Sequence, residues 1–455
     1  MADLRGVRTI HVVGAGGIGM SALAKLLCQM GFVVSGSDLK FGEPLHELGE
    51  LGIDVWQGAA PDRLNGVDLV VASSAVPDGD PELQQAQLLG IEVWRRPRLL
   101  RALTEMIRTV GATGTHGKTT TAALMVACYW ALGRNPSFVV GGRLNATGTN
   151  GALGDRDLMV LEVDEAFGTF LGLHLEGLVV TNVEADHLDY YGTVDRLEGA
   201  FADVVAGVSG PAVICVDDAG GRRLAQRSGR VTYGTSDDAD WRIVLSGEGQ
   251  EGVSFVLEHE AHGPVEVTVP KPGLHMARNA AGALALMGEL GHDIALAARG
   301  VGAFRGVHRR FEERGTVSGV VLIDDYAHHP TELTATLEAS RHGSWNRVWA
   351  VFQPHRYTRT AALGRALGSS LALADHVVVT DVYSAGEAPI PGVSGAVVAE
   401  AAEASAASVA YVPHRADLAP YLAARVEAGD LVLSLGAGDI SLLPDELARL
   451  LSRRI

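Results

Sequence analysis

The stretch GATGTHGKTTT, residues 111–121, decides the fold of this chain. The run 106–110, with its apolar and β-branched residues, predicts a strand before it, and the run 122–132 predicts a helix after it. A strand, a glycine-rich turn, Lys-Thr and a helix follow one another in phosphate-binding loops, where backbone N–H groups and the helix N-terminus face an anion. Lys118 would reach the outer phosphates of a nucleotide, and the Thr119 hydroxyl would ligate a divalent ion that bridges them.

The loop departs from the G-x-x-x-x-G-K-[ST] pattern at one place, because Ala112 occupies the position of the first glycine. A glycine- and threonine-rich surface turn is therefore the alternative interpretation. Gly114 and Gly117 flank the turn, and Lys-Thr opens the following helix. We favour a nucleoside triphosphate site.

The composition is that of a globular α/β protein. A length of 455 residues suggests about three domains, and the 47% hydrophobic and 20% charged residues are ordinary for a protein with a large core. The net charge of −17 disfavours nonspecific binding to nucleic acid or to an anionic membrane surface. An anionic nucleotide must then be held by local positive charge and backbone N–H groups.

The cysteines and the apolar runs predict a cytoplasmic protein. Cys28, Cys128 and Cys215 lie far apart, each in an apolar run, which is typical of buried free thiols in a reducing compartment. The N-terminus leads into a strand without the core of a signal peptide. No apolar run reaches the ~18 residues of a membrane span, so we expect no membrane insertion.

A second glycine motif opens the chain. The run 9–13 predicts a strand, the sequence GAGGIG follows at 14–19, and the run 20–30 predicts a helix. With Asp38 about 20 positions later, this βαβ unit matches a diphosphate-binding fingerprint, although a nicotinamide cofactor does not follow from it. Ser73 and Ser74 end a later predicted strand, where they are either hydroxyl donors to a ligand or ordinary turn residues.

Acidic residues follow two predicted strands of the middle region. Asp164 and Glu165 come after the apolar run 158–163, and the segment EADHLD, which contains His187, comes after the run 178–183. Because the carboxyl ends of parallel strands share one edge, these groups would lie beside the phosphate loop. Carboxylates with one imidazole suit Mg²⁺ or Mn²⁺, whereas helix capping is the plainer explanation of a single acidic residue.

The region 241–330 adds a small sheet, a helix and a basic cluster. Period-two alternation at 241–245, 253–257 and 265–269 predicts a small antiparallel sheet attached to the main one. His275 and Asn279 share one helix face and could both meet an adenine, although capping also explains His275. Arg305, Arg309 and Arg310 form either a solvated linker or a phosphate clamp.

The last region delivers charged and aromatic side chains to one sheet edge. A predicted strand at 320–323 leads into DDYAHHP, and another at 349–352 leads into QPHRYTR. Asp, Tyr, His and Arg side chains would therefore gather at this edge. Arginine grips carboxylates in bidentate fashion, so the edge predicts a site for a small carboxylate.

Together these patterns predict an α/β fold of three domains. The N-terminal domain, residues 1–105, would be Rossmann-like. The central domain, residues 106–308, would be a P-loop-type parallel sheet with the small antiparallel sheet. The C-terminal domain, residues 309–455, would again be Rossmann-like.

The motifs at 14–19, 114–120, 184–187, 324–332 and 352–360 resemble those of the Mur ligases, and the resemblance covers all three predicted domains. It implies a ligase that uses ATP to add L-alanine to the carboxylate of UDP-N-acetylmuramate in peptidoglycan precursor synthesis. ATP would phosphorylate the muramoyl carboxylate, the amine of L-alanine would attack the acyl phosphate, and phosphate would leave.

The resemblance also implies residue roles. Catalysis would involve Lys118, His187 and His328, and the metal, Mg²⁺ or Mn²⁺, would be held by Thr119, Glu165 and His187. ATP would be bound by Gly114, Thr115, His116, Gly117, Lys118, Thr119, Thr120, His275, Asn279, Arg310 and Asp325. The UDP-sugar would be bound by Gly14, Gly16, Gly17, Gly19, Asp38, Ser73 and Ser74, and the amino acid by Tyr326, His328, Arg356 and Arg359.

Two alternative functions stay open. A sister ligase that attaches a whole peptide to the same nucleotide sugar, as in cell-wall recycling, shares the phosphate loop. Many relatives also carry a carbamylated lysine in the middle domain, but no lysine occurs between His187 and Lys271, which favours the alanine-adding type. A nicotinamide-dependent oxidoreductase built on the first domain would leave the Lys118 loop unexplained.

Overall fold

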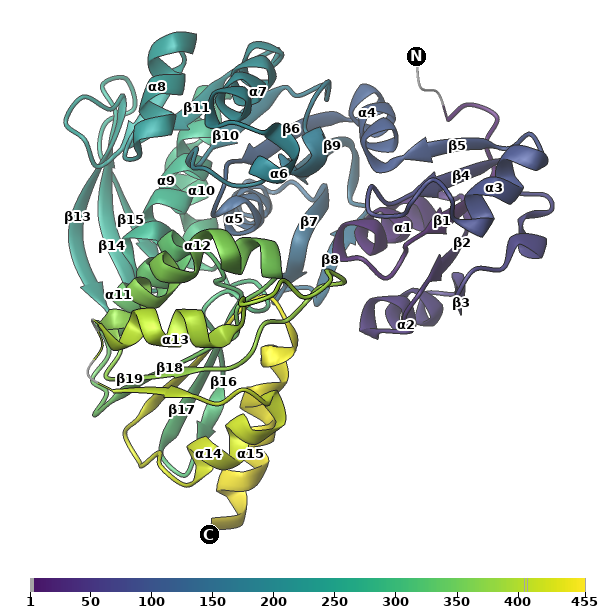
Figure 1. Cartoon of the computed structure of the whole chain (residues 1–455). Helices are drawn as coiled ribbons and strands as arrows, with labels where there is room; N and C mark the ends of the chain where they lie inside the picture. The colour runs from purple at the N-terminus through teal and green to yellow at the C-terminus, as the bar shows by residue number, and fades with distance from the viewer. Residues whose placement is uncertain (1–3, 405, 407, 455) are drawn as a thin grey trace. The chain divides into compact units, whose positions relative to one another are not determined.

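A computed structural model describes residues 4–404, 406 and 408–454. The chain has an α/β fold with three separate sheets, as predicted (Figure 1). It divides into two compact units, the first comprising residues 1–246, 255–268 and 277–305, and the second residues 247–254, 269–276 and 306–455. Within the described residues, none of the helices is both long and apolar enough to cross a membrane.

The N-terminal sheet has five parallel strands in the order β3-β2-β1-β4-β5. Its elements are β1 (Thr9–Val13), α1 (Ile18–Met30), β2 (Val33–Asp38), α2 (Glu43–Glu50), β3 (Asp54–Gln57), β4 (Leu69–Ala72), α3 (Pro81–Leu88), β5 (Glu92–Arg95) and α4 (Arg96–Met106). Leu69 and Val71 of β4 enter one hydrophobic cluster, and Val70 and Ala72 enter another. The sheet is therefore covered on both faces, and its order reverses between β1 and β4, where such sheets bind ligands.

The central sheet has ten strands in the order β15-β14-β13-β12-β11-β10-β6-β9-β7-β8. The strands are β6 (Arg108–Thr113), β7 (Pro136–Leu144), β8 (Thr149–Ala152), β9 (Asp155–Glu162), β10 (Gly177–Val180), β11 (Ala212–Cys215), β12 (Val231–Gly234), β13 (Trp241–Gly249), β14 (Gly252–Glu258) and β15 (Val265–Val269). The helices are α5 (Lys118–Ala131), α6 (Leu188–Tyr191), α7 (Val194–Ala206), α8 (Ala219–Ser228), α9 (Leu274–Glu289) and α10 (Ile294–Gly302). Strand β6 pairs in parallel with β9 and β10, so the segments after these three strands share one edge.

The central elements follow the predicted order with shifted bounds. The phosphate-loop strand β6 begins two residues later than predicted, and α5 begins at Lys118 because the loop glycines turn directly into the helix. Strands β13, β14 and β15 extend the main sheet, and β14 alternates buried and half-buried residues as its period-two pattern predicts. Strand β8, which pairs antiparallel with β7, was not predicted.

The C-terminal sheet has six strands in the order β16-β17-β21-β18-β19-β20. Its elements are β16 (Glu312–Val317), β17 (Val320–Asp325), α11 (Pro330–Ser340), β18 (Val348–Phe352), α12 (Tyr357–Ser370), β19 (His376–Val379), α13 (Gly395–Glu403), β20 (Val409–Tyr411), α14 (Leu418–Ala423), β21 (Leu431–Leu435) and α15 (Leu443–Leu451). Among the described strands of this sheet, β16 alone runs antiparallel to its neighbour. Alternate residues of β18 again enter two clusters on opposite faces.

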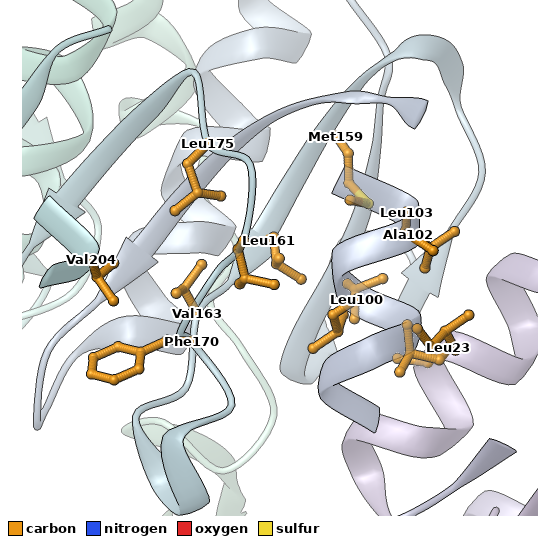
Figure 2. Close-up of a cluster of buried hydrophobic side chains, with 14 of the residues drawn as sticks. Leu23, Leu100, Ala102, Leu103, Met159, Leu161, Val163, Phe170, Leu175 and Val204 are labelled. Atoms are coloured by element: carbon orange, nitrogen blue, oxygen red, sulfur yellow. The ribbon is translucent and has the colours of Figure 1, made fainter. Parts of the chain in front are cut away.

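One hydrophobic core joins the N-terminal and central sheets within the first unit. Leu23 of α1, Leu100 and Leu103 of α4, and Met159 and Leu161 of β9 are all buried in it (Figure 2). Burial of such side chains stabilises the packing by roughly 1.5–3 kcal/mol each. The two glycine-rich loops are therefore carried by one continuously packed body.

Candidate functional site

Two glycines shape the phosphate loop between β6 and α5. Gly114 has φ +130° and Gly117 has φ +82°, conformations that side chains with a Cβ rarely adopt. A Cβ at position 114 would collide with the Thr181 hydroxyl, and one at position 117 would lie 2.5 Å from Asn279 Oδ1. The loop thus requires glycine at both positions for its backbone shape and for its close neighbours.

The segment after β10 braces this loop. The Asn182 side chain accepts from the His116 N–H at 2.9 Å and donates to the His116 carbonyl at 3.0 Å. The Thr115 hydroxyl donates to the Glu184 carbonyl at 3.2 Å and accepts from the Glu184 N–H at 2.8 Å. These paired bonds fix the backbone of the loop against the segment after β10.

Lys118 and His187 both face the carboxylate of Glu165. Lys118 Nζ lies 2.8 and 3.0 Å from the two Glu165 oxygens and 3.9 Å from Asp164 Oδ1. His187 Nε2 lies 3.9 Å from Glu165 Oε1 and 3.8 Å from Asp186 Oδ2. The segments after β6, β9 and β10 thus place a cation, carboxylates and an imidazole at one edge, as the sequence predicts.

Burial perturbs the two central charges of this site. The Glu165 side chain is only 2% exposed, and its burial raises the pKa of the carboxyl to about 7, against the opposing effect of Lys118. Burial disfavours the ammonium of Lys118, but the charges of Glu165 and Asp164 outweigh it and raise the pKa of that lysine. Lys118 therefore stays positively charged, and its ammonium donates to the Gly114 and Thr115 carbonyls as well as to Glu165.

The other predicted residues of the phosphate loop lie close by. Thr119 and Thr120 are buried in the first turn of α5. Asn279 is buried on α9, against Gly117. His275 lies one helical turn earlier on α9, beside Gly273, so the spacing on one helix face is as predicted.

The first glycine loop follows β1 and meets the ends of β2 and β4. Gly14 has φ +80°, and a Cβ there would lie 3.0 Å from Ser73 Cβ. The Gly16 N–H donates to Asp38 Oδ2 at 3.0 Å, so Asp38 here supports the loop itself. The Ser73 hydroxyl accepts from the Ala75 N–H at 3.3 Å, and Ser74 lies in the same turn.

Gly17 caps α1, and Gly19 lies in the first turn of that helix. The guanidinium of Arg96 lies against Gly19, because a Cβ there would be 2.9 Å from Arg96 Cζ. Arg96 was not among the predicted site residues, although an arginine at the start of a helix after a strand places positive charge at the same sheet edge.

In the second unit, four predicted residues lie around the end of β17: Arg310, Asp325, Tyr326 and His328. Asp325 accepts from the Ala327 and Phe311 N–H groups, each at 2.7 Å. Burial raises the pKa of Asp325 to about 6, with Arg310 opposing the shift. The Arg310 guanidinium lies 4.9 Å from the Tyr326 ring centroid, and the His328 ring packs edge-on against the same ring.

His328 is held as a neutral base. Burial lowers the pKa of His328 to about 4. Its Nδ1 lies 2.9 Å from the Tyr326 carbonyl, and a carbonyl can only accept, so Nδ1 carries the proton and Nε2 is the acceptor. His355, which was not among the predicted site residues, lies 5.9 Å from His328 between ring centroids and stacks on Tyr383.

The predicted arginines of the second unit differ in their partners. Arg356 has φ +73° and pairs with Glu387 at 2.6 Å. The positive charge of Arg359 adds to the lowering of the pKa of His328 and of His355. Arg309, of the predicted basic cluster, pairs with buried Asp324 at 3.0 Å, which makes it a structural cation.

Three family models match the chain in succession. The Mur ligase family, catalytic domain matches residues 9–108, the Mur ligase middle domain matches residues 112–287, and the Mur ligase, glutamate ligase domain matches residues 309–438.

Curated relatives match over almost the whole length. UDP-N-acetylmuramate–L-alanine ligase of Syntrophotalea carbinolica is 40% identical over 98% of this chain and 99% of its own. The enzyme of the same name from Anaeromyxobacter dehalogenans is 41% identical over 98% of both chains. Among solved structures, UDP-N-acetylmuramate-alanine ligase from Thermotoga maritima matches with a TM-score of 0.86 and 28% identity, over 98% of this chain and 100% of that one. A murein peptide ligase from Psychrobacter arcticus matches with a TM-score of 0.73 and 23% identity, over 98% and 99%.

Proposed function

The chain belongs to the Mur ligase family, and from that premise we propose that it joins L-alanine to UDP-N-acetylmuramate at the expense of ATP. The full-length identity of 40% to ligases of that name carries the proposal. The product would be an amide of the muramoyl carboxylate, a precursor of peptidoglycan. The likeness to the murein peptide ligase, at 23% identity, supports the fold alone.

The reaction has two chemical steps. A carboxylate oxygen of UDP-N-acetylmuramate attacks the γ-phosphorus of ATP, so that an acyl phosphate forms and ADP leaves. The amine of L-alanine then attacks the acyl carbon, loses a proton, and expels inorganic phosphate from the tetrahedral intermediate. Both steps bring anions together, so they need charge neutralisation and alignment rather than a covalent nucleophile.

We assign the phosphoryl step to the loop between β6 and α5. Lys118 would exchange its contact with Glu165 for the phosphates, and the N–H groups of residues 117–120, at the start of α5, would face them. The hydroxyl of Thr119, the carboxylate of Glu165 and the imidazole of His187 form a donor set that suits Mg²⁺ or Mn²⁺. A bound divalent ion would supply charge neutralisation between the phosphates.

We assign the amide-forming step to the segments after β17 and β18. His328 Nε2, kept neutral by burial, would accept the proton of the alanine amine, and Tyr326 would orient it. Arg359 and Arg356 would bind the alanine carboxylate, with Glu387 released from Arg356 on binding. His275, Asn279, Arg310 and Asp325 are proposed ATP contacts.

The organisation into three domains, 1–105, 106–308 and 309–455, is likewise a proposal, supported by the succession of the three family matches. So is a cytoplasmic location. It is supported by the three cysteines, all of which are free thiols.

Phosphate release tests the function. The purified chain should release phosphate from ATP only when UDP-N-acetylmuramate, Mg²⁺ and L-alanine are all present. Release that a peptide supports and L-alanine does not would identify the peptide-adding alternative. Reduction of NAD without ATP would overturn the assignment to ligases.

A further inference from the structure

We propose that Arg96 binds an anionic group of the nucleotide sugar between the first glycine loop and the acidic residues that follow β9. The proposal rests on the function proposed above and adds a residue to its substrate site. Arg96 is the first residue of α4, whose N-terminus also contributes partial positive charge. Its guanidinium lies against Gly19, in the first turn after the glycine loop.

The hydrogen bonds of Arg96 are incomplete. Its Nε is buried and has no hydrogen-bond partner among the described residues. Its nearest carboxylate oxygen is Asp164 Oδ2, 3.9 Å from Nη1, which is too far for a hydrogen bond. A guanidinium offers five N–H donors in a fixed fork, and here the side chain is only 20% exposed. A ligand with anionic oxygens could accept hydrogen bonds from these N–H groups.

The neighbouring arginines, in contrast, have close hydrogen-bond and ion-pair partners. Arg95 donates to the carbonyls of Ser73 and Val76 and pairs with Asp78. Arg98 pairs with Glu92 at 2.5 Å and lies over the Trp94 ring. Arg96 lies between them in the sequence but has, in the described part of the chain, no hydrogen bond or ion pair as close as theirs. A purely structural role therefore does not explain why its guanidinium is held in this place.

The position of Arg96 suits a ligand that runs from one loop to the other. Asp164 lies 3.9 Å from Arg96 on one side and 3.9 Å from Lys118 on the other. The proposed substrate carries a diphosphate, which the first glycine loop would bind, and a carboxylate that must reach the phosphates at Lys118. Either group offers paired anionic oxygens that match the guanidinium fork.

The test compares Arg96→Gln and Arg96→Lys with Arg98→Gln, a matched charge change on the same helix. Calorimetry of the full chain without ATP would measure the Kd of UDP, UDP-N-acetylglucosamine and UDP-N-acetylmuramate. Arg96→Gln should raise the Kd of UDP-N-acetylmuramate by about 10- to 100-fold. Arg96→Lys should recover part of this loss, because it keeps the charge, and Arg98→Gln should change little.

The Kd values of the three ligands show which anionic group Arg96 binds, the diphosphate or the carboxylate. Equal losses for all three assign Arg96 to the diphosphate, whereas a loss confined to UDP-N-acetylmuramate assigns it to the carboxylate. An unchanged Kd for all three overturns the proposal, as does a loss fully explained by a lower Tm of the variants. Should Arg96→Gln not fold, the Kd values of Arg96→Lys decide alone, because lysine cannot reproduce a bidentate contact.

Steady-state kinetics distinguish a failure of this inference from a failure of the proposed function. Arg96→Gln should raise the KM for UDP-N-acetylmuramate and leave the KM for ATP within about twofold. A wild-type chain that binds the nucleotide sugar but does not turn over L-alanine would overturn the proposed function, while the binding data would still decide the role of Arg96.

Discussion

At the scale of single residues, Gly117 offers a sharp test of the phosphate loop. Gly117→Ala adds a Cβ at φ +82° that would lie 2.5 Å from Asn279 Oδ1. Gly133→Ala is the matched control, because Gly133 has φ +75° with open space around it. Both should lose about 1–2 kcal/mol of unfolding free energy to backbone strain, measured by urea titration. Only Gly117→Ala should raise the KM for ATP, by about tenfold or more.

The KM comparison decides whether the collision matters. An equal KM for ATP in the two variants would mean that the loop relaxes around the added methyl group, and that its observed shape is not required for binding.

Two half-buried histidines predict acid sensitivity. Burial lowers the pKa of His328 to about 4 and of His355 to about 3, with Arg359 adding to both shifts. Below the usual pKa of about 6.5 the unfolded chain takes up protons that the folded chain refuses, so stability falls as pH drops from about 6.5 toward 4. Each histidine contributes a slope of at most about 1.4 kcal/mol per pH unit.

Urea titrations across this pH range measure the slope. His355→Phe, which keeps a ring against Tyr383, should flatten it, whereas His46→Phe, at an exposed position, should leave it unchanged. An equal slope in the wild type and His355→Phe would contradict a neutral His355.

The approach of Lys118, Glu165 and His187 could be predicted because each follows a parallel strand, and the carboxyl ends of parallel strands meet at one edge. The supporting role of Asp38 could not, since its spacing also fits a ribose contact. Arg96 was not predicted as a site residue, because the segment before it, 92–95, is a short strand with charged residues at both ends. The pattern of apolar residues alone does not predict a strand there.

At the scale of elements, the β7–β8 hairpin fixes helix α1. Asn150 of β8 accepts from buried Lys25 at 2.9 Å and donates to the Ile18 carbonyl at 2.7 Å, in the first turn after the glycine loop. Lys25 also pairs with Glu47 at 2.8 Å. A Cβ at Gly151 would lie 2.6 Å from the Ala22 carbonyl, so the backbones touch. The hairpin thus holds the helix that carries the first loop.

Asn150→Ala should lower the unfolding free energy by about 1–3 kcal/mol, because Lys25 and the Ile18 carbonyl each lose a partner in a buried place. Thr147→Ala, in the exposed turn of the same hairpin, should change it by less than about 0.5 kcal/mol. Hydrogen exchange should quicken in residues 18–25 for Asn150→Ala only. Unchanged exchange there would contradict the clamp.

Element bounds could be predicted where a short apolar run coincides with a buried strand. The bounds of β1 and β15 agree with the sequence prediction at both ends. Strand β8, with the sequence TNGA, has no apolar alternation and owes its conformation to pairing with β7 and contact with α1. Strand β2 contains Ser35, Gly36 and Ser37 and extends past its apolar start because β1 and β3 pair with it.

At the scale of the whole molecule, the predicted N-terminal and central domains share one hydrophobic core in the first unit. The sequence pattern predicts the strands of each sheet but not this shared core. An apolar helix face has the same pattern whichever sheet it packs against, so the pattern in α1 and α4 does not show which sheets they cover. The question is then whether the two glycine-rich loops act as separate sites.

The variant Lys118→Ala tests whether the two loops act as separate sites. Lys118 Nζ bonds the Gly114 and Thr115 carbonyls and Glu165, and none of these bonds reaches a residue of the N-terminal sheet. Its removal should abolish phosphate release, because the charge facing the transferred phosphoryl group is lost. The Kd for UDP-N-acetylmuramate, measured by calorimetry, should change by less than about threefold.

Two controls complete the experiment. Lys118→Ala leaves the Glu165 carboxylate buried without its cation, which can cost about 3–5 kcal/mol, so Lys118→Ala with Glu165→Gln should recover stability but not turnover. Arg156→Ala removes an exposed cation from β9 and should leave both readouts intact. Parallel losses of turnover and sugar binding in Lys118→Ala, with stability restored in the double variant, would mean that the two loops form a single site. The division of the chain near residue 105 would then be wrong.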